Sequence, residues 1–348
     1  MDRRQFILNT VSVGLGLKLS EAGYAGKAGA IIKPPALKPG DTIGLVTPAS
    51  PPFEMQQTLI EAREKIGNLG FQVKLGRNVG KKWGYLAGSD RERVQDLHEM
   101  FLDEEVKAII AIRGGYGSGR LLKYLDYNLI QEHPKIFQGY SDITSLLIGI
   151  HKRTGLITFH GPVAVSTFTD FTKSCFYTVL TKSEPAGELA DAPFKENLQS
   201  SNRVWTIKSG IGTGPLTGGN LTLICATLGT PFEIETEGRI LFIEDVGEEP
   251  NDLDRYLTHL DNAGKLEVCT GIMFDRMSAV KPSDYKPGYY SYLSKEEIIG
   301  DRLSRYNIPA CLGSSIGHVA DKPTLPLGVK ARLDTDSGRL SLLESAVS

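Results

Sequence analysis

The sequence predicts an α/β protein with two domains: a first domain built on a parallel sheet, and a second, mixed α/β domain that is richer in strands. The length of 348 residues exceeds that of a typical single domain. Up to about residue 162, short apolar segments alternate with helix-like segments, which is typical of a parallel sheet with helices on both faces. A net charge of −2, without a basic stripe, disfavours nucleic acid binding.

The first domain is expected to span residues 31–165. Ser89 fits the N-cap of a helix because apolar residues follow it at helical spacing, and Gly70 fits the end of the preceding helix. The predicted order is strand 41–50, helix 54–70, strand 71–77, helix 89–106, strand, glycine loop and helix in 107–125, strand, turn and helix in 135–155, and strand 156–162.

Residues 166–205 predict a linker, because Ser, Thr, Lys, Pro and Glu replace the regular pattern there. The second domain is then expected to span residues 206–348. Its predicted elements are a strand in 238–245, a helix in 251–264, a strand in 269–277, a tyrosine-rich loop leading into a helix in 282–299, and a strand-rich end from residue 308 onward.

The N-terminus predicts a twin-arginine-type signal peptide over residues 1–25. Arg3 and Arg4 precede a weakly apolar stretch that is too short, and too interrupted by Lys18, to be a stable membrane anchor. Small residues before Ala25 suit cleavage after that position. We therefore expect export to the periplasm, with an amphipathic or disordered N-terminal arm as the alternative.

Four cysteines, Cys175, Cys225, Cys269 and Cys311, would allow disulfides in that compartment. Three of them lie in apolar segments, and none has the spacing of metal ligands. We expect free, structural thiols.

Ser141 lies in "FQGYSDIT", between a predicted strand and an apolar helix. In open parallel sheets, catalytic and ligand-binding residues gather at the carboxyl ends of the strands. A serine on such a turn can act as a nucleophile, with the N–H of Asp142 at the helix N-terminus as an oxyanion donor. The pattern G-Y-S-D matches the hydrolase pattern G-x-S-x-G only in part, so a helix cap is the alternative role.

The stretch "RGGYGSG", from Arg113 to Gly119, is a second strand-end loop. Gly114 and Gly115 allow backbone N–H groups to approach a ligand, and these groups could supply a second oxyanion donor beside Ser141. Phosphate or dinucleotide binding is one alternative, although the glycine order matches neither G-x-G-x-x-G nor a P-loop. A simple tight turn is the other.

A serine nucleophile needs a histidine base and a carboxylate that orients the base. Of the six histidines, His160 in "TFHGP" and His318 in "GSSIGHVADKP" could both face a cleft, and spacing does not choose between them. Glu244 and Asp245 end the apolar strand of "RILFIEDVGEEP", where a buried acid needs a partner. Capping of the next turn is the alternative role for either acid.

The ordered motifs resemble the LD-carboxypeptidase family of serine peptidases, which includes the microcin C immunity peptidase. The matching motifs are "LVTPAS", "IRGGYGS", "QGYSDIT", "FHGP", "TGGNL", "LFIEDVGEEP", "DRYLTHL" and "IGHVADKPTLPLG". The resemblance implies a Ser-Glu-His triad, with Ser141 as nucleophile, His318 as general base and Glu244 as the residue that orients it. His160 would then be structural.

The resemblance also implies a flavodoxin-like first domain and an oxyanion hole made by the N–H groups of Gly114 and Asp142. The implied reaction releases D-alanine after meso-diaminopimelate in a murein tetrapeptide, through an acyl-enzyme on Ser141 and without metal or organic cofactor. A carboxypeptidase must bind the free carboxylate of its substrate, and Arg113 is the nearest cation by sequence. Family members are often dimers, so a homodimer is one expectation.

Two other functions stay open. One is cleavage of a microcin C-like aminoacyl nucleotide, for which tyrosines of "DYKPGYYSYL" would clamp the nucleotide. The other is non-catalytic binding of periplasmic peptides, with Ser141 serving only as a helix cap. The export signal itself departs from the best-known family members, which act in the cytoplasm on recycled wall fragments.

Overall fold

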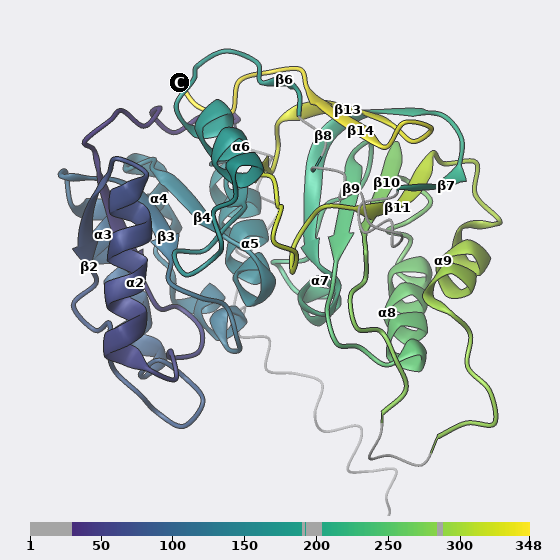
Figure 1. Cartoon of the computed structure of the whole chain (residues 1–348), viewed down its shortest axis with the longest axis horizontal. Helices are drawn as coiled ribbons and strands as arrows, with labels where there is room; N and C mark the ends of the chain where they lie inside the picture. The colour runs from purple at the N-terminus through teal and green to yellow at the C-terminus, as the bar shows by residue number, and fades with distance from the viewer. Residues whose placement is uncertain (1–29, 190–191, 193–203, 284–287) are drawn as a thin grey trace, which may run out of the picture.

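The computed structural model describes residues 30–189, 192, 204–283 and 288–348. Two sheets lie side by side, the first with the N-terminal half of the chain and the second with the C-terminal half (Figure 1). The predicted signal peptide, residues 1–25, lies outside the described residues. Within those residues, no helix has the length and apolar character needed to cross a membrane.

The first sheet has six strands in the order β12-β5-β4-β3-β1-β2, and every pair except β12 with β5 is parallel. The order β2-β1-β3-β4-β5 is that of flavodoxin-like folds, which confirms the predicted fold class. The strands are β1 (Thr42–Val46), β2 (Gln72–Leu75), β3 (Val106–Ala111), β4 (Ile136–Gly139), β5 (Phe159–His160) and β12 (Leu325–Pro326).

Helices separate these strands, as the alternating pattern predicts. Ser89 caps α3 through a capping box with Glu92, in which each side chain accepts from the other residue's backbone N–H. The helices are α2 (Met55–Asn68), α3 (Asp90–Leu102), α4 (Tyr127–Glu132), α5 (Thr144–Thr154) and the 3₁₀ helices η1 (Ser118–Tyr124) and η2 (Ser141–Ile143).

The predicted linker 166–205 differs from the structure in its first part, which forms helix α6 (Asp170–Leu180). Thr169 caps this helix, and Phe176 and Val179 are buried in the hydrophobic core. The apolar residues of this segment have the spacing that is typical of a helix packed on one face, but the many Ser, Thr and Lys residues around them make this spacing hard to recognise in the sequence. Residues 193–203 of the predicted linker lie outside the described residues.

The second sheet has eight strands in the order β6-β14-β13-β8-β9-β10-β11-β7. Its centre, β8 to β11, is parallel, and the outer strands pair antiparallel, as expected for a mixed domain. The strands are β6 (Gly187–Glu188), β7 (Trp205–Lys208), β8 (Ile211–Asn220), β9 (Ile240–Glu244), β10 (Gly271–Asp275), β11 (Ala310–Ser314), β13 (Lys330–Asp334) and β14 (Arg339–Leu342), with helices α7 (Leu221–Thr227), α8 (Pro250–Asn262) and α9 (Lys295–Leu303). All four cysteines are buried and free, which confirms that prediction.

Contacts between residues that are distant in sequence join the two halves of the molecule. The chain returns from the second half to add β12 to the first sheet, where Leu325 pairs with His160. The backbone N–H of Asn220, at the end of β8, donates to Thr144 Oγ1 at the start of α5 over 3.0 Å. The C-terminal Ser348 pairs through its backbone with Pro34 and Ala36. The bond between Asn220 and Thr144 brings the residues after β4 close to the carboxyl ends of β8 and β9.

Candidate active site

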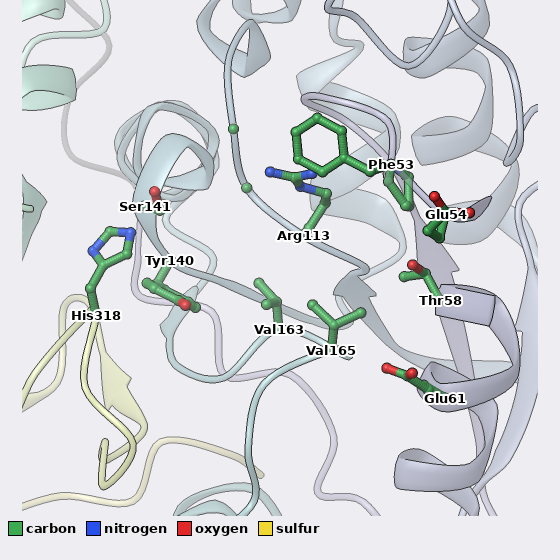
Figure 2. A pocket seen from close by; sticks show the side chains of 13 residues that line it. Phe53, Glu54, Thr58, Glu61, Arg113, Tyr140, Ser141, Val163, Val165 and His318 are labelled. Atoms are coloured by element: carbon green, nitrogen blue, oxygen red, sulfur yellow. The ribbon is translucent and has the colours of Figure 1, made fainter. Parts of the chain in front are cut away.

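A pocket of about 540 Å³ opens where the loops of the two halves meet. Figure 2 shows Ser141 and His318 at one end, Glu54 and Glu61 at the other, and Arg113 between them. The lining residues are Pro52, Phe53, Glu54, Thr58, Glu61, Arg113, Gly114, Gly115, Tyr140, Ser141, Val163, Val165 and His318. The loops after β1, β3 and β4 all contribute, as expected for the carboxyl ends of parallel strands.

Ser141 stands on a strained turn between β4 and α5. Its φ of 62° lies in the left-handed region, which a non-glycine residue rarely adopts. No side chain caps η2 or α5, so Ser141 is not the helix cap that the sequence left open. The turn instead presents the serine side chain to the pocket.

The glycine loop after β3 packs directly against this serine. A Cβ atom at Gly114 would lie 3.1 Å from Ser141 Cβ, so a side chain at this position would crowd the serine. Within the described part of the chain, neither the Gly114 N–H nor the Asp142 N–H donates a hydrogen bond to another protein group. Both predicted oxyanion donors are therefore available beside Ser141.

The Asp142 side chain fixes the relative position of these two loops. Its carboxylate accepts from the backbone N–H of Gly117 over 3.1 Å and of Ser118 over 2.8 Å. The Ser118 hydroxyl in turn donates to the Asp142 carbonyl. Burial raises the pKa of the Asp142 carboxyl, and the bonds from Ser118 and Gly117 oppose that shift. Asp142 thus holds the glycine loop against the serine turn.

His318 and Glu244 form a hydrogen-bonded pair at the same end of the pocket. His318 Nδ1 lies 2.7 Å from Glu244 Oε2, and Glu244 is fully buried while the His318 side chain is 22% exposed. Gly317 permits this contact, since a Cβ there would lie 2.5 Å from Glu244 Oε2. Because the carboxylate accepts from Nδ1–H, the neutral ring keeps Nε2 free to accept a proton. The ring and Ser141 line the same end of the pocket (Figure 2).

Asp245, next to Glu244 in sequence, has different partners, which lie around the start of α7. Its carboxylate accepts from the Asn220 side chain, and from both the N–H and the hydroxyl of Thr222, at 2.9 to 3.0 Å. Thr222 lies in the first turn of α7. The two neighbouring acids therefore bind different parts of the second half of the chain, His318 and the start of α7.

His160, the other candidate base, lies beneath the pocket and does not line it. It is buried between the rings of Tyr140 and Phe242, with centroids at 6.1 and 5.2 Å. Among the described residues, neither ring nitrogen has a hydrogen-bond partner. Burial lowers the pKa of His160 to about 3, so it is neutral at physiological pH.

Two residues near the pair were not singled out from the sequence. The Tyr140 ring packs edge-on against His318 at 5.0 Å, and Lys322 Nζ lies 5.3 Å from the centroid of the same ring. Lys322 is only 5% exposed, and burial lowers its pKa to about 8. The sequence could have indicated Tyr140, because it is next to Ser141. It gives no comparable indication for Lys322, which lies in a polar stretch.

Arg113 lies in the pocket as predicted. Its guanidinium is 5.3 Å from the Phe53 ring centroid, and Nη1 donates to the Pro51 carbonyl over 3.3 Å. The wall formed by Phe53, Glu54 and Glu61 was not predicted. It follows β1, and the tendency of functional residues to gather at the carboxyl ends of parallel strands would have indicated it. Tyr289, Tyr290 and Tyr292 of the tyrosine-rich loop do not line this pocket, and Tyr285 lies outside the described residues.

Family models match both halves of the chain. The model described as the LD-carboxypeptidase N-terminal domain matches residues 43–161, and that of the LD-carboxypeptidase C-terminal domain matches residues 213–333. The chain belongs to the LD-carboxypeptidase family. This confirms the resemblance carried by the motifs, and it makes the protein a carboxypeptidase of that family.

Individual relatives match over most of their length. A probable murein peptide carboxypeptidase of Bacillus subtilis (strain 168) is 40% identical over 321 residues, which covers 91% of this chain and 95% of the relative. The microcin C7 self-immunity protein MccF of Escherichia coli is 30% identical over 332 residues, covering 89% and 95%. Both kinds of LD-carboxypeptidase family member are thus similar to this chain.

Solved structures give the same result for the fold. A muramoyltetrapeptide carboxypeptidase from Oxalobacter formigenes has a TM-score of 0.72 at 30% identity, covering 86% of this chain and 97% of that one. Wild-type MccF in its apo state has a TM-score of 0.79 at 28% identity, covering 91% and 100%. The two-domain architecture is shared with both.

Proposed function

We propose that the protein is a serine LD-carboxypeptidase that hydrolyses the amide before the terminal D-alanine of murein tetrapeptides. The observation that carries the proposal is the His318–Glu244 pair, 2.7 Å apart, at the same end of one pocket as the strained Ser141. Similarity to a probable murein peptide carboxypeptidase and to a muramoyltetrapeptide carboxypeptidase supports the substrate class.

In the acylation step, Ser141 Oγ attacks the carbonyl carbon of the scissile amide while His318 Nε2 takes its proton. The buried Glu244 carboxylate holds the ring in the required tautomer and stabilises the imidazolium that forms. The N–H groups of Gly114 and Asp142 stabilise the oxyanion of the tetrahedral intermediate. His318 then gives its proton to the leaving amine, and D-alanine departs.

In the deacylation step, a water attacks the ester on Ser141, and His318 again takes and returns the proton. Arg113 lies in the pocket and is the cation proposed to bind the terminal carboxylate of the substrate. The chemistry requires only these side chains and backbone groups, so we propose that the enzyme works without a metal or an organic cofactor.

The test uses the purified protein and a murein tetrapeptide, with mass spectrometry following the release of one alanine. We expect release by the wild type and none by Ser141→Ala that retains the native circular dichroism spectrum. A fluorophosphonate probe should label the wild type at Ser141. Labelling without release would redirect the search to aminoacyl-nucleotide substrates, whereas neither labelling nor release would favour a peptide-binding protein.

We also propose export to the periplasm through the arginine pair Arg3 and Arg4. The observation in support is the order of that pair, the weakly apolar stretch and the small residues before Ala25. Fractionation of cells that express the full chain should recover the protein from the periplasm. A variant with lysine at both arginine positions should stay in the cytoplasm, and equal export of the two proteins would contradict the proposal.

A further inference from the structure

Four polar residues form a row across the carboxyl ends of the parallel strands β8 to β11. Asn220 pairs with Glu244 in the register of β8 and β9, and Asp275 pairs with Ser314 in that of β10 and β11. Between β9 and β10, Ile243 pairs with Phe274, so the next residues along, Glu244 and Asp275, are opposite each other. Opposite residues of parallel neighbours share one face, and the strands are about 4.8 Å apart.

Glu244 and Asp275 each leave one buried oxygen without a partner. Both residues are fully buried. Glu244 Oε2 accepts from His318, and Asp275 Oδ1 accepts from the Met277 N–H over 2.6 Å. Within the described part of the chain, Glu244 Oε1 and Asp275 Oδ2 have no hydrogen-bond partner. Two unpaired carboxylate oxygens on one face of adjacent strands would be strongly unfavourable if both groups were charged.

The charges around Asp275 decide which of the two acids is neutral. Burial is the largest cause of a pKa of Asp275 raised well above 3.8, and the like charges of Glu244, the last residue of β9, and of Asp245, the residue after it, add to the rise. Backbone hydrogen bonds from Met277 and Asp245 to Asp275 oppose it. Glu244 is the better placed anion, because it bonds to His318 and Lys322 lies close enough to interact with its charge. Arg276, the residue after β10, donates from its side chain to Ser315, and its positive charge interacts with Asp321 and, less strongly, with Asp275.

We propose that Asp275 is protonated and donates a hydrogen bond from Oδ2 to Glu244 Oε1, which makes it a positioning residue for the His318–Glu244 pair. One proton then satisfies both unpaired oxygens. It also removes one of two adjacent charges and fixes the Glu244 carboxylate in the plane that His318 requires. The inference rests on the proposed function only for its effect on catalysis.

The first test is independent of activity and uses the full chain and Asp275→Asn. A group whose pKa is higher in the folded than in the unfolded state contributes stability below the unfolded pKa, and this contribution is lost as the pH rises toward the folded pKa. Asparagine keeps a donor and does not titrate. The Tm of Asp275→Asn relative to the wild type should therefore rise between pH 4 and pH 7, by about 2 °C or more. A difference that is constant or falls would overturn the proposal.

Infrared spectroscopy keeps the proposal testable if Asp275→Asn does not fold. The wild type at pH 7 should show the C=O stretch of a buried, protonated carboxylic acid. Absence of any such band in the folded wild type would overturn the proposal without reference to a variant.

The second test measures the effect on catalysis with two variants of Asp275. Asp275→Ala removes the donor, and we expect kcat/KM to fall about tenfold or more, as for other groups that orient a catalytic residue. Asp275→Asn should have a kcat/KM close to that of the wild type at neutral pH. At alkaline pH, ionisation of Asp275 should lower the kcat/KM of the wild type, whereas that of Asp275→Asn should not fall for this reason. Equal losses in both variants, with the wild-type pH profile, would show a merely structural role. An inactive wild type that passes the Tm test would instead point to failure of the proposed function.

Discussion

Two histidines lie within one aromatic cluster of this protein and differ in almost every property that catalysis requires. His160 and His318 both contact Tyr140, from opposite halves of the chain. His318 has a carboxylate partner at 2.7 Å and is 22% exposed at the side chain. His160 is 1% exposed, and neither of its ring nitrogens has a partner among the described residues.

The difference teaches that proximity to the nucleophile does not make a histidine a base. A base must gain a positive charge, and only His318 has an anion placed to stabilise that charge. At His160, burial penalises the charged form and keeps the ring neutral. The same residue type thus fills apolar space at one site and, in the proposed mechanism, accepts a proton at the other.

Removal of the His318 ring should have the largest effect. We expect His318→Ala to lower kcat by about 10⁴-fold or more, because Ser141 loses its proton acceptor. The matched control is His160→Leu, which replaces the other ring of the cluster and should keep most of the wild-type activity. Equal loss of activity in both folded variants would contradict the different roles that we assign to the two histidines.

Substitution Glu244→Gln should have the next largest effect. Glutamine keeps the shape of Glu244 but loses the charge and can donate to Nδ1, which favours the unproductive tautomer of His318. We expect kcat to fall about 10³-fold with little change in KM, in steady-state assays with a murein tetrapeptide. A loss confined to KM would mean that Glu244 binds substrate and does not orient the base.

Acid should reveal His160 through stability. Its pKa of about 3 lies below the usual 6.5, so the unfolded chain binds a proton that the folded protein does not. This residue's contribution to stability is complete above about pH 6.5 and is lost progressively as the pH falls toward 3. His160→Leu should therefore have a Tm that declines less between pH 7 and pH 4 than that of the wild type. Parallel Tm curves for the two proteins would contradict this account of His160.

Local patterns were sufficient to predict the parallel strands of the first sheet and the serine turn, but not β12, which joins that sheet from the second half of the chain. The alternation of apolar and amphipathic segments predicted parallel strands connected by helices. Ser89 and Gly70 correctly marked a helix start and a helix end. Helix α6 was missed, because polar residues interrupt its apolar face. Ser141, Arg113 and Glu244 were predicted as candidate site residues from the sequence, because each follows or ends a predicted strand.

Long-range contacts decided what the sequence left open. Spacing could not separate His160 from His318, because the difference arises from distant partners: the His160 ring packs against Phe242, and His318 bonds to Glu244. The different partners of Glu244 and Asp245, His318 and Thr222, are likewise distant in sequence. Asp275 ends an apolar strand like Glu244, yet its unpaired oxygen becomes visible only once β9 and β10 lie side by side.

Substitution of Lys322 should have the smallest effect on the comparison between His160 and His318, because the charge of Lys322 acts near both histidines. It lowers the pKa of His160, after burial and His318, and it interacts with Glu244. Lys322→Met removes a positive charge close to the His318–Glu244 pair, so a proton on His318 becomes easier to hold. We expect the acid limb of the kcat/KM profile to move to higher pH by a few tenths of a unit, roughly the effect of one partly screened charge. Lys322→Arg keeps the charge and should leave the limb in place. A shift of the same size in both variants would mean that packing against Tyr140, and not charge, is what Lys322 contributes.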